Sequence, residues 1–122
     1  MVDGKITAFE DLIVWQESQD LAVLAYKLSK SFPKEEVFGL TSQLKRAATS
    51  VSANIAEGFG RRSQKDKLHF YAIAYGSLLE TKNFFYLCQK LGYTSAQEIE
   101  ALLAKVTSRQ KLLNALMRSL QS

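Results

Sequence analysis

The sequence predicts an all-α protein, an antiparallel up-down-up-down four-helix bundle. Apolar residues recur three and four positions apart along four segments, and short breaks containing proline, glycine or serine separate these segments. No run shows the two-residue alternation of a β-strand. A chain of 122 residues with 47% hydrophobic content matches one ordinary globular domain, so we expect a single bundle domain over residues 1–122.

The first two helices are indicated by stripes of regular spacing. The first stripe alternates spacings of four and three residues: Val14, Ser18, Leu21, Ala25, Leu28 and Phe32. Because Pro33 cannot continue a helix, we expect the first helix to end near Phe32. The second stripe consists of Leu40, Leu44, Ala47, Val51 and Asn54 beside Ile55. It should end at residues 58–60 (GFG), where a glycine can take the left-handed conformation of a helix terminus.

The third and fourth helices each begin with a capping signal. Ser63 followed by Asp66 opens a helix whose inner face carries Leu68, Tyr71, Tyr75, Leu78 and Phe85, and Gly92 closes it. Ser95 followed by Glu98 repeats the signal before Ile99, Leu103, Val106, Leu113, Leu116 and Leu120. Helices of roughly 20 residues are about 30 Å long, and the short connections force neighbours to run antiparallel.

Composition indicates the compartment. The only cysteine is Cys88, which excludes an internal disulfide and fits a reducing cytoplasm. The first five residues, MVDGK, lack the features of a signal peptide, and no segment approaches the roughly 18 consecutive apolar residues of a membrane span. We therefore expect a cytoplasmic protein without membrane contact.

Charge is unevenly distributed along the chain. Residues 1–40 hold four Lys against seven Asp and Glu, whereas residues 41–122 hold twelve Lys and Arg against five Asp and Glu. The basic excess of the second part would favour polyanions if it gathered on one face, and it would be ordinary solvated helix surface if it did not.

Five motifs occur in a fixed order: FEDLIVWQ at 9–16, FPKEE at 32–36, GLTSQLKRAA at 39–48, SVSANIAEG at 50–58 and YGSLLE at 75–80. From about Phe9 to Tyr93 the chain resembles the bacterial four-helix bundle proteins named for the intervening sequences of 23S rRNA genes. The last helix matches only in its apolar pattern.

The resemblance implies a homo-oligomer, a pentameric ring of bundles without known enzymatic activity. It also implies a shared architecture with the accessory protein of diversity-generating retroelements, which binds nucleic acid and a reverse transcriptase. This chain is only mildly basic in comparison with that accessory protein.

No catalytic or metal-binding arrangement is visible in the sequence. His69 and Cys88 are single residues of their types and lie nineteen positions apart on one predicted helix, about 28 Å, so they cannot form a dyad in one chain. Metal sites in bundles use Glu-x-x-His pairs, whereas Asp66 precedes His69 and no second histidine exists. We expect no enzyme activity, metal or cofactor. We also expect a surface or boundary position for His69 and an apolar packing role for Cys88.

A polar set lies on or beside the inward faces of the second and third helices: Gln43, Arg46, Ser50, Asn54, Glu57, Ser77 and Glu80. Buried polar groups need partners, so these residues form either a structural polar network or a ligand pocket. Because the two helices run antiparallel, Arg46 comes within reach of Glu80. We expect this pair to be mutually bonded and largely buried.

Aromatic residues crowd more than one face of the third helix: Phe70, Tyr71, Tyr75, Phe84, Phe85 and Tyr86. One core cannot bury all of them, so some should meet another surface. An oligomer interface is the first interpretation. A stacking platform for single-stranded nucleic acid is the alternative, although few lysines lie between the rings.

Three functions remain open. The first is an oligomeric nucleic-acid-associated protein whose phosphate contacts show little sequence preference and come from Arg61, Arg62, Lys65, Lys67, Lys105, Arg109, Lys111 and Arg118. The second is a scaffold or adaptor that binds another protein through the surface of the ring. The third, a small-ligand or enzymatic bundle, requires a pocket that the sequence does not show.

Overall fold

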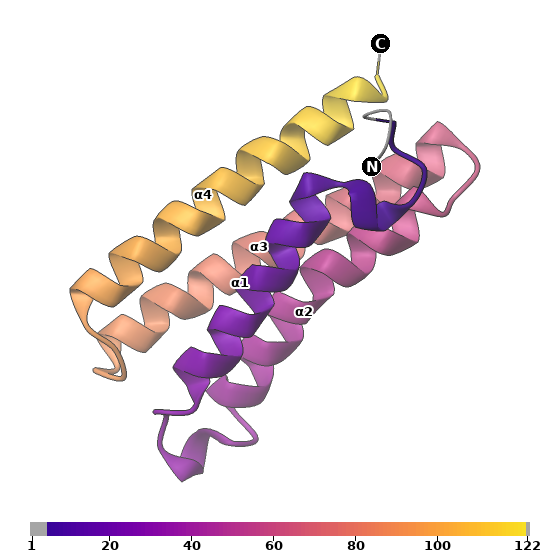
Figure 1. Cartoon of the computed structure of the whole chain (residues 1–122). Coiled ribbons are helices and arrows are strands. Elements are labelled where there is room, and N and C mark those ends of the chain that lie inside the picture. Colours follow the sequence, from indigo (N-terminus) through magenta and orange to yellow (C-terminus); the bar gives the residue numbers. More distant parts are fainter. Residues whose placement is uncertain (1–4, 122) are drawn as a thin grey trace.

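Figure 1 shows the computed structural model of the chain, which describes residues 5–121. Within them lie four α-helices: α1 (Ile13–Ser29), α2 (Leu40–Phe59), α3 (Gln64–Lys90) and α4 (Ala96–Ser119). Two short 3-10 helices, η1 (Phe9–Asp11) and η2 (Lys34–Glu36), precede α1 and α2. No strand occurs in this part of the chain, so the predicted all-α four-helix bundle is confirmed.

Successive helices run in opposite directions along the bundle (Figure 1). Between α1 and α2, the side-chain amide of Gln19 donates to Ser52 Oγ at 2.9 Å, and Lys45 Nζ lies 4.7 Å from the centre of the Tyr26 ring. Residue numbers therefore rise along α1 while they fall along α2, as in an antiparallel pair.

The α2–α3 pair shows the same relation. Lys67 Nζ donates to the backbone carbonyl of Phe59 at 2.6 Å near the connecting turn, and Arg46 pairs with Glu80 further down the bundle. α1 and α3 each pack against α2 and α4, so the helices follow one another around the core.

The core confirms the predicted stripes except at Leu68, which is only partly buried and does not belong to the core cluster. Its fully buried side chains come from all four α-helices and include Leu21, Leu44, Val51, Ile55, Leu78, Phe85, Ile99, Val106 and Leu113. Burying each large apolar side chain contributes about 1.5 to 3 kcal/mol, which makes this cluster the main source of stability.

Both predicted capping signals are present in the structure. Ser63 Oγ accepts a hydrogen bond from the amide of Asp66 at 3.0 Å, and Ser95 Oγ accepts one from the amide of Glu98 at 3.1 Å. Each bond satisfies an amide that has no partner within its helix. Gly92, which has a φ of 79°, follows α3 in the left-handed conformation that glycine tolerates.

Two predicted helix ends need correction. α1 ends at Ser29 rather than near Phe32, because the next three amides turn back to carbonyls only three residues earlier. At the end of α2, Gly60 has a φ of −77° and stays right-handed, so the left-handed terminus expected there is wrong. The role of glycine in this stretch is close packing: a Cβ on Gly58 would lie 2.7 Å from the Tyr71 ring.

No helix within residues 5–121 is long and apolar enough to cross a membrane. The prediction that the N-terminus lacks a signal peptide rests mainly on residues 1–4, which lie outside the described residues.

Candidate nucleic-acid interface

The α2–α3 turn carries the densest group of cations in the chain. Arg62 and Lys65 are both exposed, and neither pairs with a carboxylate of the described residues. They flank Ser63, whose side chain caps the start of α3. A cation that is exposed and unpaired is available to contact a phosphate.

The other two cations of this turn already have partners. Arg61 pairs with Glu57 at 2.8 Å and lies 4.4 Å from the centre of the Phe70 ring. Lys67 donates to the Phe59 carbonyl and lies 5.2 Å from the ring of the same residue. The structure thus divides the predicted cluster into two free cations and two that support the turn.

The predicted cations of α4 also divide into two groups, exposed residues and one buried residue. Lys105, Lys111 and Arg118 are exposed, as a phosphate contact requires. Arg109 is only 7% exposed, and its guanidinium donates to the backbone carbonyls of Glu17 at 3.2 Å and Lys105 at 3.3 Å. Its prediction as a phosphate ligand is therefore wrong, because the side chain points into the bundle.

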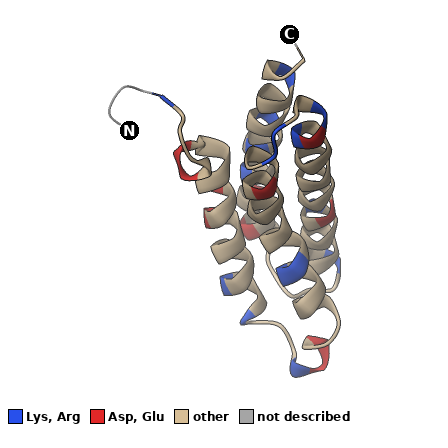
Figure 2. Cartoon of the chain, turned by 90° about the vertical axis from the view of Figure 1, so that its right-hand side faces the viewer, with Lys and Arg blue, Asp and Glu red and all other residues tan. Residues whose placement is uncertain are grey.

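The remaining cations gather partly at one end of the molecule. Figure 2 shows Lys and Arg segments at the α2–α3 turn and in the last turn of α4, and these two places lie at the same end of the bundle. Arg62, Lys65 and Arg118 belong to them, whereas Lys105 lies further down α4. Only part of the predicted set therefore forms one surface.

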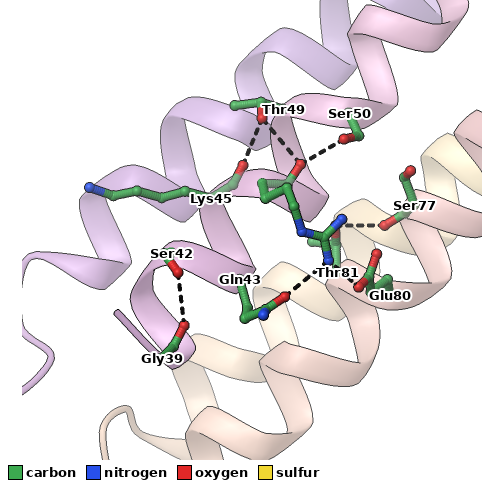
Figure 3. A network of polar contacts seen from close by, with 10 residues as sticks. Gly39, Ser42, Gln43, Lys45, Thr49, Ser50, Ser77, Glu80 and Thr81 are labelled. Carbon is green, nitrogen blue, oxygen red and sulfur yellow. Dashed lines mark hydrogen bonds and ion pairs between the residues drawn. The ribbon is translucent and has the colours of Figure 1, made fainter. Parts of the chain in front are cut away.

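The predicted pair of Arg46 and Glu80 is present, but it is not buried. The Arg46 guanidinium bonds to the Glu80 carboxylate across α2 and α3 and also to Gln43 Oε1 at 3.1 Å (Figure 3). The two side chains are 53% and 36% exposed. Gln43 is exposed as well. The pair bridges the outer edge of the helix contact, where both long side chains reach water.

The rest of the polar set bonds locally instead of forming a network between helices. Ser50 Oγ donates to the Arg46 carbonyl, and Asn54 Nδ2 donates to the Ser50 carbonyl, each at 2.8 Å. Glu57 is exposed and binds Arg61, four residues later in the turn after α2. Side chains of these types often satisfy themselves on the preceding turn of their own helix. The prediction of one buried network is therefore wrong.

The two residues weighed for catalysis lie in contrasting places. His69 is exposed beside the Phe70 ring, 5.4 Å between centroids, which confirms its predicted surface position. Cys88 is fully buried, as predicted, and burial raises the pKa of its thiol from 9.0 to about 11. Within residues 5–121 no group of three or more His, Cys, Asp or Glu residues gathers as metal ligands would.

A further feature is a groove of about 690 Å³ between α1 and α2. Its walls include Trp15, Ala22, Val23 and Tyr26 from α1 and Ala53 and Ala56 from α2. The sequence stripes predicted buried positions but gave no sign of this groove, because alanine carries little apolar signal at an exposed position.

Comparisons with known proteins agree with this geometry. The model of the 23S rRNA-intervening sequence protein family matches residues 10–115, which is most of the chain. The chain belongs to this family. The match continues through most of α4, beyond the stretch whose motifs suggested the resemblance.

One solved structure similar to this 23S rRNA-intervening sequence protein is a crystal structure from Bacteroides thetaiotaomicron. It is described as a protein with unknown function from the S23 ribosomal protein family. The two chains share 26% sequence identity with a TM-score of 0.79, over 86% of this chain and 98% of that one. Among curated proteins no match was found. The relation to the accessory protein of diversity-generating retroelements stays a prediction.

Arg109 is the residue whose role the sequence analysis missed, although a signal was present. Ile99, Leu102, Val106, Arg109 and Leu113 follow the alternating spacing of three and four residues that marks the buried side of a helix. An arginine in such a stripe indicates a buried structural cation in this family member, rather than a surface contact for nucleic acid.

Proposed function

We propose that this chain has no catalytic chemistry of its own and acts as an oligomeric, nucleic-acid-associated bundle protein in the cytoplasm. The observation that carries the proposal is the basic end of the bundle, which we define as Arg62 and Lys65 at the α2–α3 turn and Arg118 at the end of α4. All three are exposed, and none pairs with a carboxylate of the described residues.

Phosphate contacts explain both what this end could bind and how selective it would be. Each Lys or Arg that meets a phosphate releases counterions, which gives affinity that depends on salt. Such contacts do not read bases, so RNA or DNA of different sequences should bind alike. Three cations on one chain would bind weakly, and several chains in one assembly would combine their contacts through multivalency.

The position of Cys88 supports a role without covalent catalysis. Nucleophilic cysteines are exposed to substrate and have lowered pKa values, because the thiolate is the reactive form. Cys88 is buried and its pKa is raised to about 11. Its environment therefore favours an inert thiol.

Self-assembly is the second part of the proposal. The outer face of α3 and the residue after its end leave apolar side chains 40–48% exposed: Ile73, Leu79, Tyr86 and Leu87 on the helix and Leu91 directly after it. Several exposed apolar side chains on one helix support contact with another protein surface. A second copy of the chain is the partner we propose, and the pentamer that the family resemblance implies is the state we expect.

A protein-binding scaffold is the second candidate function, and one observation favours it. Phe38 is 94% exposed and its neighbour Val37 is 52% exposed, at the end of the bundle that holds the α1–α2 connection. The Tyr93 hydroxyl donates a 2.8 Å hydrogen bond to the carboxylate of Glu36, two residues before Phe38. This bond fixes the segment that carries Phe38. An exposed aromatic side chain on a connection that is fixed by a hydrogen bond is typical of an anchor residue in a protein–protein interface.

The two candidates differ in their response to nuclease and to ligand length. A pull-down from native lysate should lose its partners after nuclease treatment if nucleic acid carries the interaction. In addition, the assembled protein should bind a long single-stranded RNA much more tightly than an oligonucleotide that reaches only one subunit. Partners that survive nuclease, together with equal affinity for both RNA lengths, would favour the scaffold.

Assembly itself is tested by light scattering at micromolar concentration. A mass of several protomers supports the proposal, with five expected from the resemblance. A mass of one or two protomers would exclude the ring.

A further inference from the structure

A group of planar side chains lies at the α2–α3 turn, and we call Arg61, His69 and Phe70 the stacking group. Arg61 Cζ lies 4.4 Å from the centre of the Phe70 ring. The Phe70 ring in turn contacts the His69 imidazole edge to face, with 5.4 Å between the ring centroids and 81° between the ring planes. A guanidinium and two aromatic rings therefore adjoin one another where α3 begins.

Two members of the stacking group are open to solvent. His69 is exposed, and the Arg61 side chain is 44% exposed. Gly76, two helical turns after His69 on the same face of α3, has no side chain and borders open space. The imidazole and the guanidinium are therefore accessible to another planar group.

The third member, Phe70, is fixed by its contact with α2. It is partly buried, and a Cβ added at Gly58 would lie only 3.1 Å from Phe70 Cβ, so the two helices meet closely here. Arg61 is fixed as well, because its guanidinium pairs with the Glu57 carboxylate at 2.8 Å. Side chains that are already ordered lose little conformational entropy when a ligand packs against them. The stacking group is thus preorganised for a flat ligand.

The two free cations of the turn lie next to this group. Lys65 precedes His69 by four residues, so both side chains lie on one face of α3. Side chains of a helix lean toward its N-terminus, which directs His69 toward Lys65 and toward the turn that carries Arg62. A flat ligand on the stacking group would therefore have two unpaired cations beside it.

The charges of this region favour an anionic ligand. The stretch of residues 57–70 contains four cations and two carboxylates, Glu57 and Asp66. Glu57 is already paired within the turn, so Asp66 is the carboxylate that a bound anion would meet. The unpaired Arg62 and Lys65 outnumber it, and the local charge stays positive.

Planar groups beside unpaired cations match the chemistry of a single nucleic-acid strand. Its bases can pack on aromatic rings and on guanidinium planes while its phosphates contact Lys and Arg. In a duplex the bases are stacked on one another, so only phosphates and groove edges would meet this surface. Because a duplex carries its phosphates at higher charge density than a single strand, cations acting alone would favour the duplex.

We infer that the basic end selects single-stranded nucleic acid, with a base stacked on the stacking group and neighbouring phosphates on Arg62 and Lys65. The inference rests on the phosphate binding proposed above and adds which class of nucleic acid is bound. Sequence preference stays slight, because every base has a face that can stack.

Three ligands of equal length separate stacking from charge. They are a thymidine strand, an abasic strand that keeps the phosphates but carries no bases, and a thymidine–adenine duplex. Fluorescence anisotropy of the assembled protein measures the three affinities. The thymidine strand should bind at least about 5-fold more tightly than the abasic strand, since stacking of one base strengthens binding by about 5- to 100-fold. It should also bind more tightly than the duplex, despite the denser charge of the duplex.

Variants of the stacking group should remove this preference. His69→Ala leaves the core untouched because His69 is exposed, and Phe70→Leu keeps an apolar side chain at the contact with α2. Each should lower the affinity for the thymidine strand toward that for the abasic strand, and the affinity for the abasic strand should stay at the parental value. Gln89→Ala replaces an exposed uncharged residue at the other end of α3 and is the control, which should keep the parental preference. Circular dichroism should show unchanged helix content in all three.

The imidazole provides a direct signal of stacking. His69 is the only histidine of the chain, so its ring C–H resonances need no further assignment. A purine stacked on the imidazole should move these resonances upfield through its ring current. An adenine strand should therefore shift them, whereas an abasic strand of equal length should leave them close to their position in the free protein.

The outcomes separate this inference from the proposed phosphate binding. If the parent binds the three ligands alike or prefers the duplex, the stacking inference is wrong while phosphate binding stands. The same conclusion follows if both variants keep the parental preference or if the adenine strand leaves the His69 resonances unmoved. If the parent binds none of the ligands at low salt, both proposals fail. A preference for the thymidine strand that the variants lose, together with the upfield shift, supports selection of single strands.

Discussion

Arg109 on α4 reaches across the bundle to α1, where its guanidinium donates a 3.2 Å hydrogen bond to the Glu17 carbonyl and lies 3.5 Å from the Glu17 carboxylate. The arginine side chain is 9% exposed, and the glutamate side chain is 35% exposed. A buried cation held by two backbone carbonyls and one carboxylate fixes how α4 sits against α1.

Replacing Arg109 should therefore destabilise the fold. Arg109→Ala removes three contacts and leaves the Glu17 groups with fewer partners, so we expect a loss of about 2 to 4 kcal/mol in the free energy of unfolding. Urea unfolding followed by circular dichroism measures this. Lys105→Ala, four residues earlier and exposed, is the control and should change stability by less than about 0.5 kcal/mol. Equal midpoints for the two variants would contradict the assigned role.

Arg46 and Glu80 should contribute much less, although they also form an ion pair between helices. Both side chains are more than a third exposed, so water and salt screen their attraction. We expect Arg46→Ala and Glu80→Ala each to cost less than about 1 kcal/mol, with a coupling energy of similar size in a double-mutant cycle. A coupling well above this value would show that the pair is shielded from water.

The contrast between these two arginines shows how far the sequence predicts the structure. Apolar spacing and the Ser63 and Ser95 caps gave the helices, because both are local patterns. The antiparallel order of α2 and α3 predicted that Arg46 lies near Glu80. Counting residues does not show whether long side chains point into the core or toward solvent. Arg109 was predicted to contact phosphate because it is charged, although its spacing along α4 places it on the buried side of the helix. The groove depends on small residues from two helices, which leave no periodic signal.

Gly58 should resist substitution because its helix packs closely on α3. An added Cβ would lie 2.7 Å and 2.8 Å from Tyr71 ring carbons and 3.1 Å from Phe70 Cβ. Tyr71 is buried and cannot move freely, so Gly58→Ala should cost about 1 to 3 kcal/mol. Gly60→Ala is the control, since its Cβ would have no neighbour nearer than 3.6 Å. Thermal unfolding of both variants measures the difference. A Gly58→Ala protein that melts at the parental temperature would exclude this tight contact.

Cys88 should make stability depend on pH in the alkaline range. Burial raises the pKa of its thiol to about 11 in the folded chain, so folding favours the neutral form. The stability that the neutral thiol contributes is fully present below pH 9 and is lost as the pH rises through about 11. From pH 8 to pH 10.5 the parent should lose about 1 to 2 kcal/mol relative to Cys88→Ala. If the difference between the two proteins stays constant across this range, the thiol does not titrate as its burial requires.

The basic end is tested most directly by the salt dependence of binding to a long single-stranded RNA, followed by fluorescence anisotropy. Arg62→Ala/Lys65→Ala removes two exposed cations from the α2–α3 turn. Lys34→Ala/Lys90→Ala removes two exposed cations from the other end of the bundle and serves as the control.

If the basic end contacts phosphates, the turn variant should bind all RNA sequences more weakly. The slope of log affinity against log salt should become shallower, by about 0.7 for each lost contact with a single strand. The control should keep the parental affinity and slope. An assembled parent that binds no RNA at low salt, or a control that loses as much affinity as the turn variant, would contradict phosphate binding at this end.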